Sequence, residues 1–279
     1  MELALWFIVV IVIGAFLCEY VDSTLGMGYG TTLTPALLLF GFSPMQIVPA
    51  ILLSELISGV LAGIFHHFEG NVDFKPKTMN LSKIKGMINT GGFFHGLRNT
   101  LSFHSKIALL LAGCSIIGTI AAVFIAINIP KFWLKLYIGI LVLSMGLVIL
   151  ILHNRNFRFS PKKIFCLGLL ASFNKGMSGG GYGPIVTSGQ ILSGVQGKSA
   201  VGITSLAEGL TCLVGVIAYA LISSNPVSWG LAPYIVIGAV LSVPFSAKSV
   251  KIISTKKLKL AIAILTIALG ILTIVKTIV

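Results

Sequence analysis

Charged residues inside apolar runs are the first chemical feature of this sequence. Lys175 is the only cation in the glycine-rich stretch from Asn174 to Pro184, which separates two apolar runs. Glu55 and Glu208 each lie near the middle of another apolar run. Such charges are costly inside a membrane and usually line a polar path, bind an ion or meet an opposite charge. An ammonium group at this position could bind a small anion.

Two other roles are open for Lys175. The apolar run before it, about 164–173, is short, so the ammonium group could extend to the cytoplasmic membrane surface. Lys175 could also pair with Asp22, which occupies the corresponding place in the first half of the chain. Such an ion pair would cancel the charge that an anion needs.

Glu55 and Glu208 have alternative roles as well. They could carry protons, or they could hold the glycine-rich backbone through hydrogen bonds. Two permanent carboxylates beside an anion site would repel the ligand, which favours the structural role. Protonation on alternate sides of the membrane would remove this objection, so coupling to protons stays open. Asp22 is a third coupling or structural carboxylate in this interpretation.

The glycine-rich stretch has a counterpart at Asp22 to Thr31, so the chain is an internal duplication. One gap-free register aligns Gly26 with Gly179, Gly28 with Gly181, Tyr29 with Tyr182, Gly30 with Gly183, Thr34 with Thr187, Gly41 with Gly194 and Glu55 with Glu208. Corresponding broken segments in the two halves of a membrane protein indicate a transporter binding site.

Glycine at a break in a helix lets a ligand approach the backbone closely. Pro184 suits the first turn of a helix that would direct free N–H groups and a positive dipole end at an anion. The alternative is that the glycines only permit close helix packing. The predicted substrate-binding residues are Lys175, Asn174, Ser178, Gly179, Gly180, Gly181, Tyr182, Gly183, Gln190, Thr204 and Ser205 from the second half, and Gly26, Gly28, Tyr29, Gly30 and Thr31 from the first.

The elements that position these residues must lie in lipid. The 279 residues are 56% hydrophobic and 10% charged, and the mean hydropathy is +1.02. No soluble domain of this size could bury so much apolar surface. The net charge of +13 comes from Lys and Arg between the apolar runs, which is typical of an integral membrane protein and not of a nucleic-acid partner. The first run, from Leu3 to Leu17, lacks a positive flank and is predicted to be a retained helix.

The sequence predicts an all-α, polytopic membrane protein of two inverted repeats, each with about five membrane segments and a glycine-broken or short helix, giving eight to ten spans. The predicted division is 1–152 for the first repeat, 153–163 for a basic linker and 164–279 for the second repeat. The apolar segments are about 3–20, 31–42, 47–65, 107–127 and 132–152 in the first half and 164–173, 184–193, 199–222, 229–247 and 258–278 in the second. The second segment of each half is too short for a full span.

The basic loops predict the orientation. The loop 66–106 carries Lys75, Lys77, Lys83, Lys85, Arg98 and Lys106, whereas its counterpart, 222–228, has no charge. Cytoplasmic loops are enriched in Lys and Arg, so equivalent loops on opposite faces make the repeat inverted. We expect loop 66–106 and the linker in the cytoplasm, both termini outside, and the protein in the cytoplasmic (inner) membrane.

Other kinds of chemistry have weak signals. Cys18, Cys114, Cys166 and Cys212 are isolated within apolar runs and predict neither disulfides nor a metal site. The run from His66 to Glu69 lacks the histidine spacing of a zinc helix. The sequence has no Walker loop, dinucleotide fingerprint or nucleophile triad motif, so we expect no enzyme, no metal and no cofactor.

The paired motifs GMGYGTTLTPALLLFGF and GMSGGGYGPIVTSGQILSG, each followed by a glutamate-bearing segment, resemble the TauE/SafE sulfite exporter family of permeases. The resemblance covers nearly the whole chain, although Met27 stands where a glycine is common in the first motif. It implies movement of sulfur-containing anions such as sulfite, thiosulfate or organosulfonates across the cytoplasmic membrane.

Three functions follow as hypotheses. The first is a secondary transporter that binds a small anion at the bilayer midplane and exposes it to each side in turn. The second is an ungated anion channel, and the third is a membrane scaffold or sensor that works through loop 66–106. The particular anion, the direction, the coupling ion and the oligomeric state are not set by the sequence.

Overall fold

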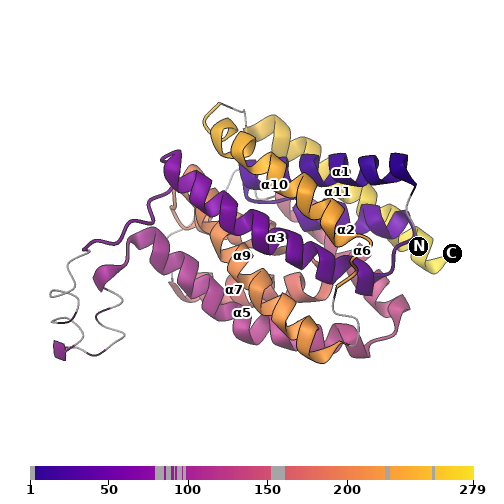
Figure 1. Ribbon diagram of the computed structural model, residues 1–279, viewed down its shortest axis with the longest axis horizontal. Helices are drawn as coiled ribbons and strands as arrows, with labels where there is room; N and C mark the ends of the chain where they lie inside the picture. Colours follow the sequence, from indigo (N-terminus) through magenta and orange to yellow (C-terminus); the bar gives the residue numbers. More distant parts are fainter. Residues whose placement is uncertain are drawn as a thin grey trace.

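In the computed structural model, residues 4–78, 99–151, 161–223, 227–252 and 255–279 are described, with a few positions between 85 and 96. This part of the chain is a bundle of α-helices without strands (Figure 1), which confirms the predicted all-α fold. The helices are α1 (Leu5–Leu25), α2 (Tyr29–Leu39), α3 (Pro44–Phe68), α5 (Phe103–Asn128), α6 (Lys131–Ile151), α7 (Pro161–Ser178), α8 (Tyr182–Leu192), α9 (Gly197–Ile222), α10 (Ala232–Ser249) and α11 (Thr255–Ile278).

The helices differ in whether they can cross a bilayer. Six of the described helices are long and apolar enough to do so: α1, α3, α5, α6, α9 and α10. The short helices α2 and α8 have 11 residues each, about half of what a span needs. Each begins at the tyrosine that follows a glycine break. The protein is therefore polytopic, while the total of eight to ten spans stays a prediction.

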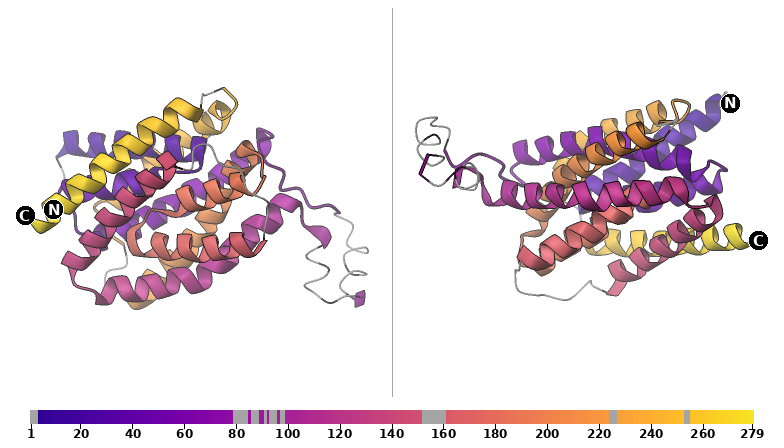
Figure 2. Two further views of the ribbon diagram at one scale, coloured as in Figure 1. Left: turned by 180° about the vertical axis from the view of Figure 1, so that it is seen from behind. Right: turned by 90° about the horizontal axis from the view of Figure 1, so that it is seen from below.

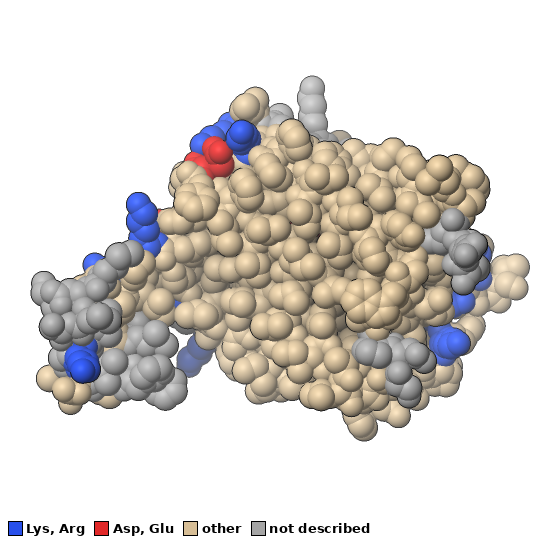
Figure 3. Space-filling view, in the orientation of Figure 1, with Lys and Arg blue, Asp and Glu red and all other residues tan. Residues whose placement is uncertain are grey.

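The surface and the interior show that lipid is the solvent. Large apolar side chains such as Trp6, Ile117 and Phe124 are mostly exposed, whereas Glu55, Lys175 and several hydroxyl residues are buried. The charges visible in Figure 3 lie toward the two ends of the long axis, with uncharged surface between them. Water would penalise this arrangement, and a hydrocarbon layer around the middle of the bundle favours it.

Helices pack in pairs that follow the proposed repeat. The equivalent helices α3 and α9 pack on each other, as do α6 and α11. Two other large contacts, α1 with α10 and α5 with α7, correspond to each other under the same equivalence. The beginning of α3 lines one cleft with the end of α9, so these two equivalent helices run in opposite directions. This packing agrees with an inverted duplication, and the division into 1–152, 153–163 and 164–279 stays a prediction.

The bundle has two distinct ends. Both chain termini lie at one end, here called the terminal end, together with the start of α3 and the end of α9 (Figures 1 and 2). The opposite end, here called the loop end, holds the end of α3 and the start of α5. At the loop end Asn71 donates to the Ala247 carbonyl near the end of α10, and the Ser199 hydroxyl near the start of α9 donates to the Asn71 carbonyl.

The break in the second half is narrower than the sequence indicated. Helix α7 continues to Ser178, so Asn174 and Lys175 are helical and do not belong to a loop. The helix ends where Gly179 adopts a left-handed φ of 72°. Gly26, with a φ of 70°, ends α1 in the same way. Polar residues can continue a helix at this depth because their side chains find partners inside the protein.

Candidate functional site

The two glycine breaks contact each other at the centre of the bundle. A Cβ atom at Gly30 would overlap the carbonyl of Gly179, and one at Gly183 would overlap the carbonyl of Gly26. Gly30 and Gly183 are equivalent in the repeat, and so are Gly26 and Gly179. Close packing, the alternative role of these glycines, is therefore what the structure shows at these positions.

Threonines from the short helices tie each break to the other half. Thr34 of α2 donates to the Ser178 carbonyl at 2.9 Å, and Thr187 of α8 donates to the Gly26 carbonyl at 2.6 Å. Carbonyls in the last turn of a helix lack an intrahelical donor, and no water can replace it in a hydrocarbon layer. The hydroxyl groups supply that donor, so each break is satisfied by the opposite half of the chain.

Lys175 lies between the two equivalent glutamates. Its side chain is 0% exposed. The ammonium donates to Glu208 Oε1 at 2.7 Å and forms a second, closer ion pair with Glu55 Oε2. The prediction that Lys175 extends to the membrane surface is therefore wrong, because two internal carboxylates hold its charge. The glutamates bind the ammonium group, whereas the sequence had suggested backbone hydrogen bonds for them.

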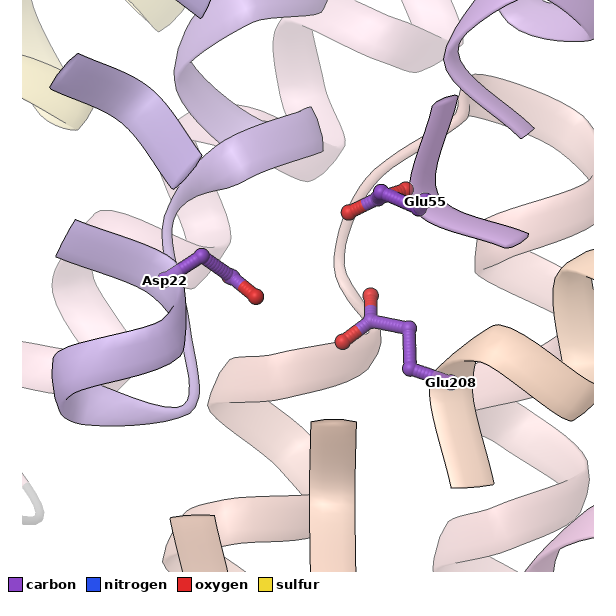
Figure 4. A group of neighbouring side chains, drawn as sticks. All are labelled: Asp22, Glu55 and Glu208. Atoms are coloured by element: carbon purple, nitrogen blue, oxygen red, sulfur yellow. The ribbon is translucent and has the colours of Figure 1, made fainter. Parts of the chain in front are cut away.

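Asp22 points toward the same centre from α1 (Figure 4). Carboxylate oxygens of Asp22, Glu55 and Glu208 lie within 4.8 Å of one another. Among the described residues, Lys175 pairs with the two glutamates and not with Asp22. Asp22 Oδ1 instead accepts the backbone N–H of Tyr29 at 3.1 Å. The ion pair with Asp22 that the sequence suggested is therefore not formed, and Asp22 caps the start of α2.

The central cluster has more carboxylates than cations. Three acidic side chains surround the single ammonium of Lys175, and a fourth, Glu19, lies one turn before Asp22 on α1 and is 2% exposed. Glu19 Oε1 accepts the Ser23 hydroxyl at 2.6 Å. Three acidic oxygens are a common metal site, but here the ammonium already occupies the place of the cation. The local charge favours protons or other cations on the acids.

The predicted polar residues of the second half form one wall beside this cluster. Gln190 Nε2 donates to Thr204 Oγ1 at 2.8 Å, and the hydroxyl oxygens of Thr187 and Thr204 lie 2.9 Å apart. Asn174 Oδ1 accepts the hydroxyl of Tyr137 at 2.7 Å. Gln190 Oε1 is buried and has no hydrogen-bond partner among the described residues, so this wall holds one unused acceptor.

Some predicted residues use their polar groups locally. Ser205 donates to the Val201 carbonyl of its own helix, and Thr31 donates to the Gly28 carbonyl. Ser178 donates to the Asn174 carbonyl and accepts the Gly180 N–H. These groups shape the backbone around the breaks. Their role toward a substrate stays a prediction.

Every predicted site residue is buried, so the centre is closed to both ends in this conformation. Two clefts lie at opposite ends of the bundle. The cleft at the terminal end has a volume of about 800 Å³ and is lined by Ser43, Met45, Gln46, Ile127, Lys131, Ile222, Ser223, Val227 and Ser228. The cleft at the loop end has about 390 Å³ and is lined by Thr24, Leu25, Ile191, Gln196, Gly197, Lys198, Val201 and Val250. The start of α3 lines the first and the start of its equivalent, α9, lines the second.

Two buried residues of the bundle, Glu19 and His66, were not predicted to belong to the site. Glu19 carries the same signal as Glu55, an acid inside an apolar run, but its counterpart in the second half is Ser172, so the repeat did not point to it. His66 was considered only as a metal ligand. Its ring and that of His67 bind different partners, since His66 contacts the Ser23 carbonyl and His67 Nδ1 accepts the Phe74 N–H.

Comparison with known proteins shows which family this sequence matches. The sequence profile described as "Sulfite exporter TauE/SafE" matches residues 10–82 and 81–273. The chain is also similar to a Bacillus subtilis (strain 168) protein named "Probable membrane transporter protein YtnM", with 28% identity over 244 residues that cover 83% of this chain and 70% of the relative. No solved structure matches.

Proposed function

The chain belongs to the sulfite exporter TauE/SafE family and is a multi-pass membrane transporter, and from this premise we propose that it is a secondary transporter of small sulfur-containing anions. The family name gives sulfite, and thiosulfate and organosulfonates are proposed with it as anions of the same class. No enzymatic activity is proposed. The observation that carries the proposal is Lys175, a fully buried cation held by two glutamates at equivalent positions of the two halves.

The ion pairs of Lys175 set a condition for anion binding. An anion can reach the ammonium only if it replaces a glutamate, and the displaced carboxylate must not keep a negative charge beside the anion. Glu55 Oε1 and Glu208 Oε2 are buried and have no hydrogen-bond partner among the described residues, so each can take a proton. We therefore propose that protons accompany the anion, with Glu55 and Glu208 as their carriers.

The two clefts support transport by alternating access. They lie at opposite ends, and each is lined by the start of one glutamate-bearing helix. Opening of either cleft to the centre would expose Lys175 to one side of the membrane only. A permanently open channel is disfavoured because all predicted site residues are buried. The excess of Lys and Arg in the loops at the loop end supports placing that end in the cytoplasm and both termini outside.

Flux measurements in proteoliposomes test this function. Sulfite or thiosulfate uptake should saturate with concentration and rise with an imposed proton gradient. Lys175→Met combined with Glu55→Gln and Glu208→Gln removes all three charges of the ion-paired group together and should abolish the flux. Lys251→Ala, which removes only an exposed ion pair with Glu69, is the matched control and should transport normally.

The glutamates can be tested separately. With Lys175 retained, Glu55→Gln and Glu208→Gln together leave the ammonium free for an anion but remove both proton carriers. Anion binding should persist, and the dependence of flux on a proton gradient should disappear. Non-saturating flux in wild type would indicate a channel. Full flux in the triple variant would show that the ion-paired centre is not the binding site.

A further inference from the structure

We propose that His66 and Tyr219 are a pair of positioning residues that keep the two ends of the transporter closed, each by one hydrogen bond to a broken helix. Here the His66 clamp means His66, Asn71 and Ser23, and the Tyr219 clamp means Tyr219 and Gly176. The inference rests on the proposed transport function for its biological role. The geometry of the clamps does not depend on which solute is carried.

The His66 clamp joins α3 to the end of α1. The ring is 0% exposed, and its Nε2 lies 2.8 Å from the Ser23 carbonyl. A carbonyl only accepts, so Nε2 carries the proton in this bond. Nδ1 then accepts the side-chain N–H of Asn71 at 3.0 Å. Both ring nitrogens of a neutral imidazole are thus satisfied, and the ring is fixed in one tautomer.

The Tyr219 clamp is the equivalent contact in the second half. The Tyr219 hydroxyl is buried and donates to the Gly176 carbonyl at 3.1 Å. In the register of the repeat, Tyr219 corresponds to His66 and Gly176 to Ser23. Each ring lies eleven residues after its glutamate, and each acceptor lies three residues before a left-handed glycine. Two different side-chain types therefore make the same bond at equivalent places.

The backbone at the breaks explains why a donor is needed there. The N–H of Gly26 bonds the Asp22 carbonyl, and that of Gly179 bonds the Lys175 carbonyl. The next carbonyl on each helix belongs to the acceptor of a clamp. In α7 the N–H that a continued helix would offer, that of Gly180, bonds the Ser178 hydroxyl instead. A buried carbonyl without a donor is costly, so the ring supplies what the break removed.

The acceptors lie between the centre and the clefts. Ser23 is flanked by Asp22, which points to the central cluster, and by Thr24, which lines the loop-end cleft. Tyr219 lies one turn before Ile222, which lines the terminal-end cleft. Each clamp therefore joins a broken helix to a glutamate-bearing helix on the side of the centre where one cleft lies. That bond must break before the cleft on its side can reach Lys175.

The two clamps differ in strength. Asn71 also donates to the Ala247 carbonyl, and its own carbonyl accepts the Ser199 hydroxyl, so the His66 clamp links α1, α3, α9 and α10. The Tyr219 clamp contains one hydrogen bond between α9 and α7. Breaking the loop-end clamp disturbs more contacts, and the closed conformation should therefore open more readily at the terminal end.

A native cysteine reports on both openings. Cys212 is 0% exposed, and its sulfur lies 4.0 Å from Glu55 Oε2 in the central cluster. With Cys18, Cys114 and Cys166 replaced by alanine, a sulfonated, membrane-impermeant methanethiosulfonate is applied to oriented vesicles from either side. His66→Phe should raise the rate of Cys212 labelling from the loop end. Tyr219→Phe should raise it from the terminal end.

The expected change is roughly two- to tenfold in each rate, which corresponds to the loss of one hydrogen bond. His66→Gln keeps a donor at a similar reach and should restore slow labelling, which guards against a general loss of folding. Tyr20→Phe is the matched control, since it removes a hydroxyl bond to Ser249 outside both clamps and should change neither rate.

The side of the membrane from which Cys212 labelling rises in each variant tests the clamps. Labelling that rises equally from both sides in both variants, or that does not rise in either, overturns the clamps, whereas opposite sidedness supports them. A protein that shows opposite sidedness but carries no sulfur oxyanion would refute the proposed substrate and keep the clamps. Normal saturable flux of a sulfur oxyanion with unchanged labelling would refute the clamps and keep the proposed substrate.

Discussion

The substitution Lys175→Met tests whether the ammonium group holds the centre of the fold together. Methionine is unbranched and one heavy atom shorter than lysine, so it fills most of the same space and removes the charge. Glu55 and Glu208, whose side chains are 3% and 5% exposed, would then face each other and Asp22 without a cation. Carboxylates in this position must take up protons or repel one another.

The magnitude follows from the burial of the partners. Removing one partner of a buried ion pair typically costs about 3 to 5 kcal/mol, because the remaining charge stays buried without compensation. At about 2 to 4 °C per kcal/mol for a chain of this size, the midpoint of thermal unfolding should fall by roughly 6 to 20 °C. The triple variant with Glu55→Gln and Glu208→Gln leaves no such charge. It should unfold within about 2 kcal/mol of wild type, since replacing a whole buried ion pair is often neutral.

Thermal stability of the purified protein in one detergent, at one pH and one protein concentration, measures this series. The important comparison is between the single and the triple variant, because both lack Lys175 and only the single variant keeps the glutamate charges. A Lys175→Met variant as stable as wild type, or no recovery of stability with the two additional glutamines, would refute this stabilising role of the ammonium group.

Three further predictions concern other parts of the bundle. Gly30→Ala should lower the amount of folded protein recovered in detergent, because its Cβ would overlap a carbonyl of the other break. Gly14→Ala is the control and should have no effect, since no atom lies within 4 Å of the new Cβ. Equal recovery of the two variants would argue against tight packing at Gly30. Glu19→Gln removes a buried charge with no cation partner among the described residues and should leave the unfolding temperature unchanged or higher, so a large decrease would show that the charge is needed. A cysteine at Lys251 should react with an impermeant reagent only from the cytoplasm and one at Lys276 only from outside, and the reverse pattern would invert the proposed orientation.

The sequence predicted the parts of the fold that follow from local pattern. Apolar run lengths located the helices to within a few residues, and the positive φ values of Gly26 and Gly179 follow from the role of glycine at a helix end. The sequence predicted that the helix α7 ends at about residue 173, five residues before its end at Ser178. Asn174 and Lys175 are polar and looked like part of a loop, and only their partners in other helices make a helical conformation tolerable there.

The sequence predicted which charged residues are buried together but not how they pair. Internal similarity pointed to Glu55 and Glu208, because equivalent charges in a membrane are rarely accidental, and Lys175 stood out as the only cation of the glycine-rich stretch. It could not show that the ammonium pairs with both glutamates and leaves Asp22 to cap α2, since this choice depends on how α7 packs against α3 and α9. The equivalence of His66 and Tyr219 was present in the register, but two residues of different chemistry give no sequence signal.

The unlike charges of Asp22 and Lys175 limit what an ancestor of this protein could have been. Two identical halves assembled as a homodimer must carry the same residue at both places, so that a lone ammonium between two glutamates cannot form. A single chain that carries both halves is free of that constraint. The cation is carried by one broken helix only. The inward-facing and outward-facing forms are therefore not related by the two-fold symmetry of the repeat. A difference in energy between the two forms, and hence a resting preference for one side of the membrane, is therefore built into the covalent chain.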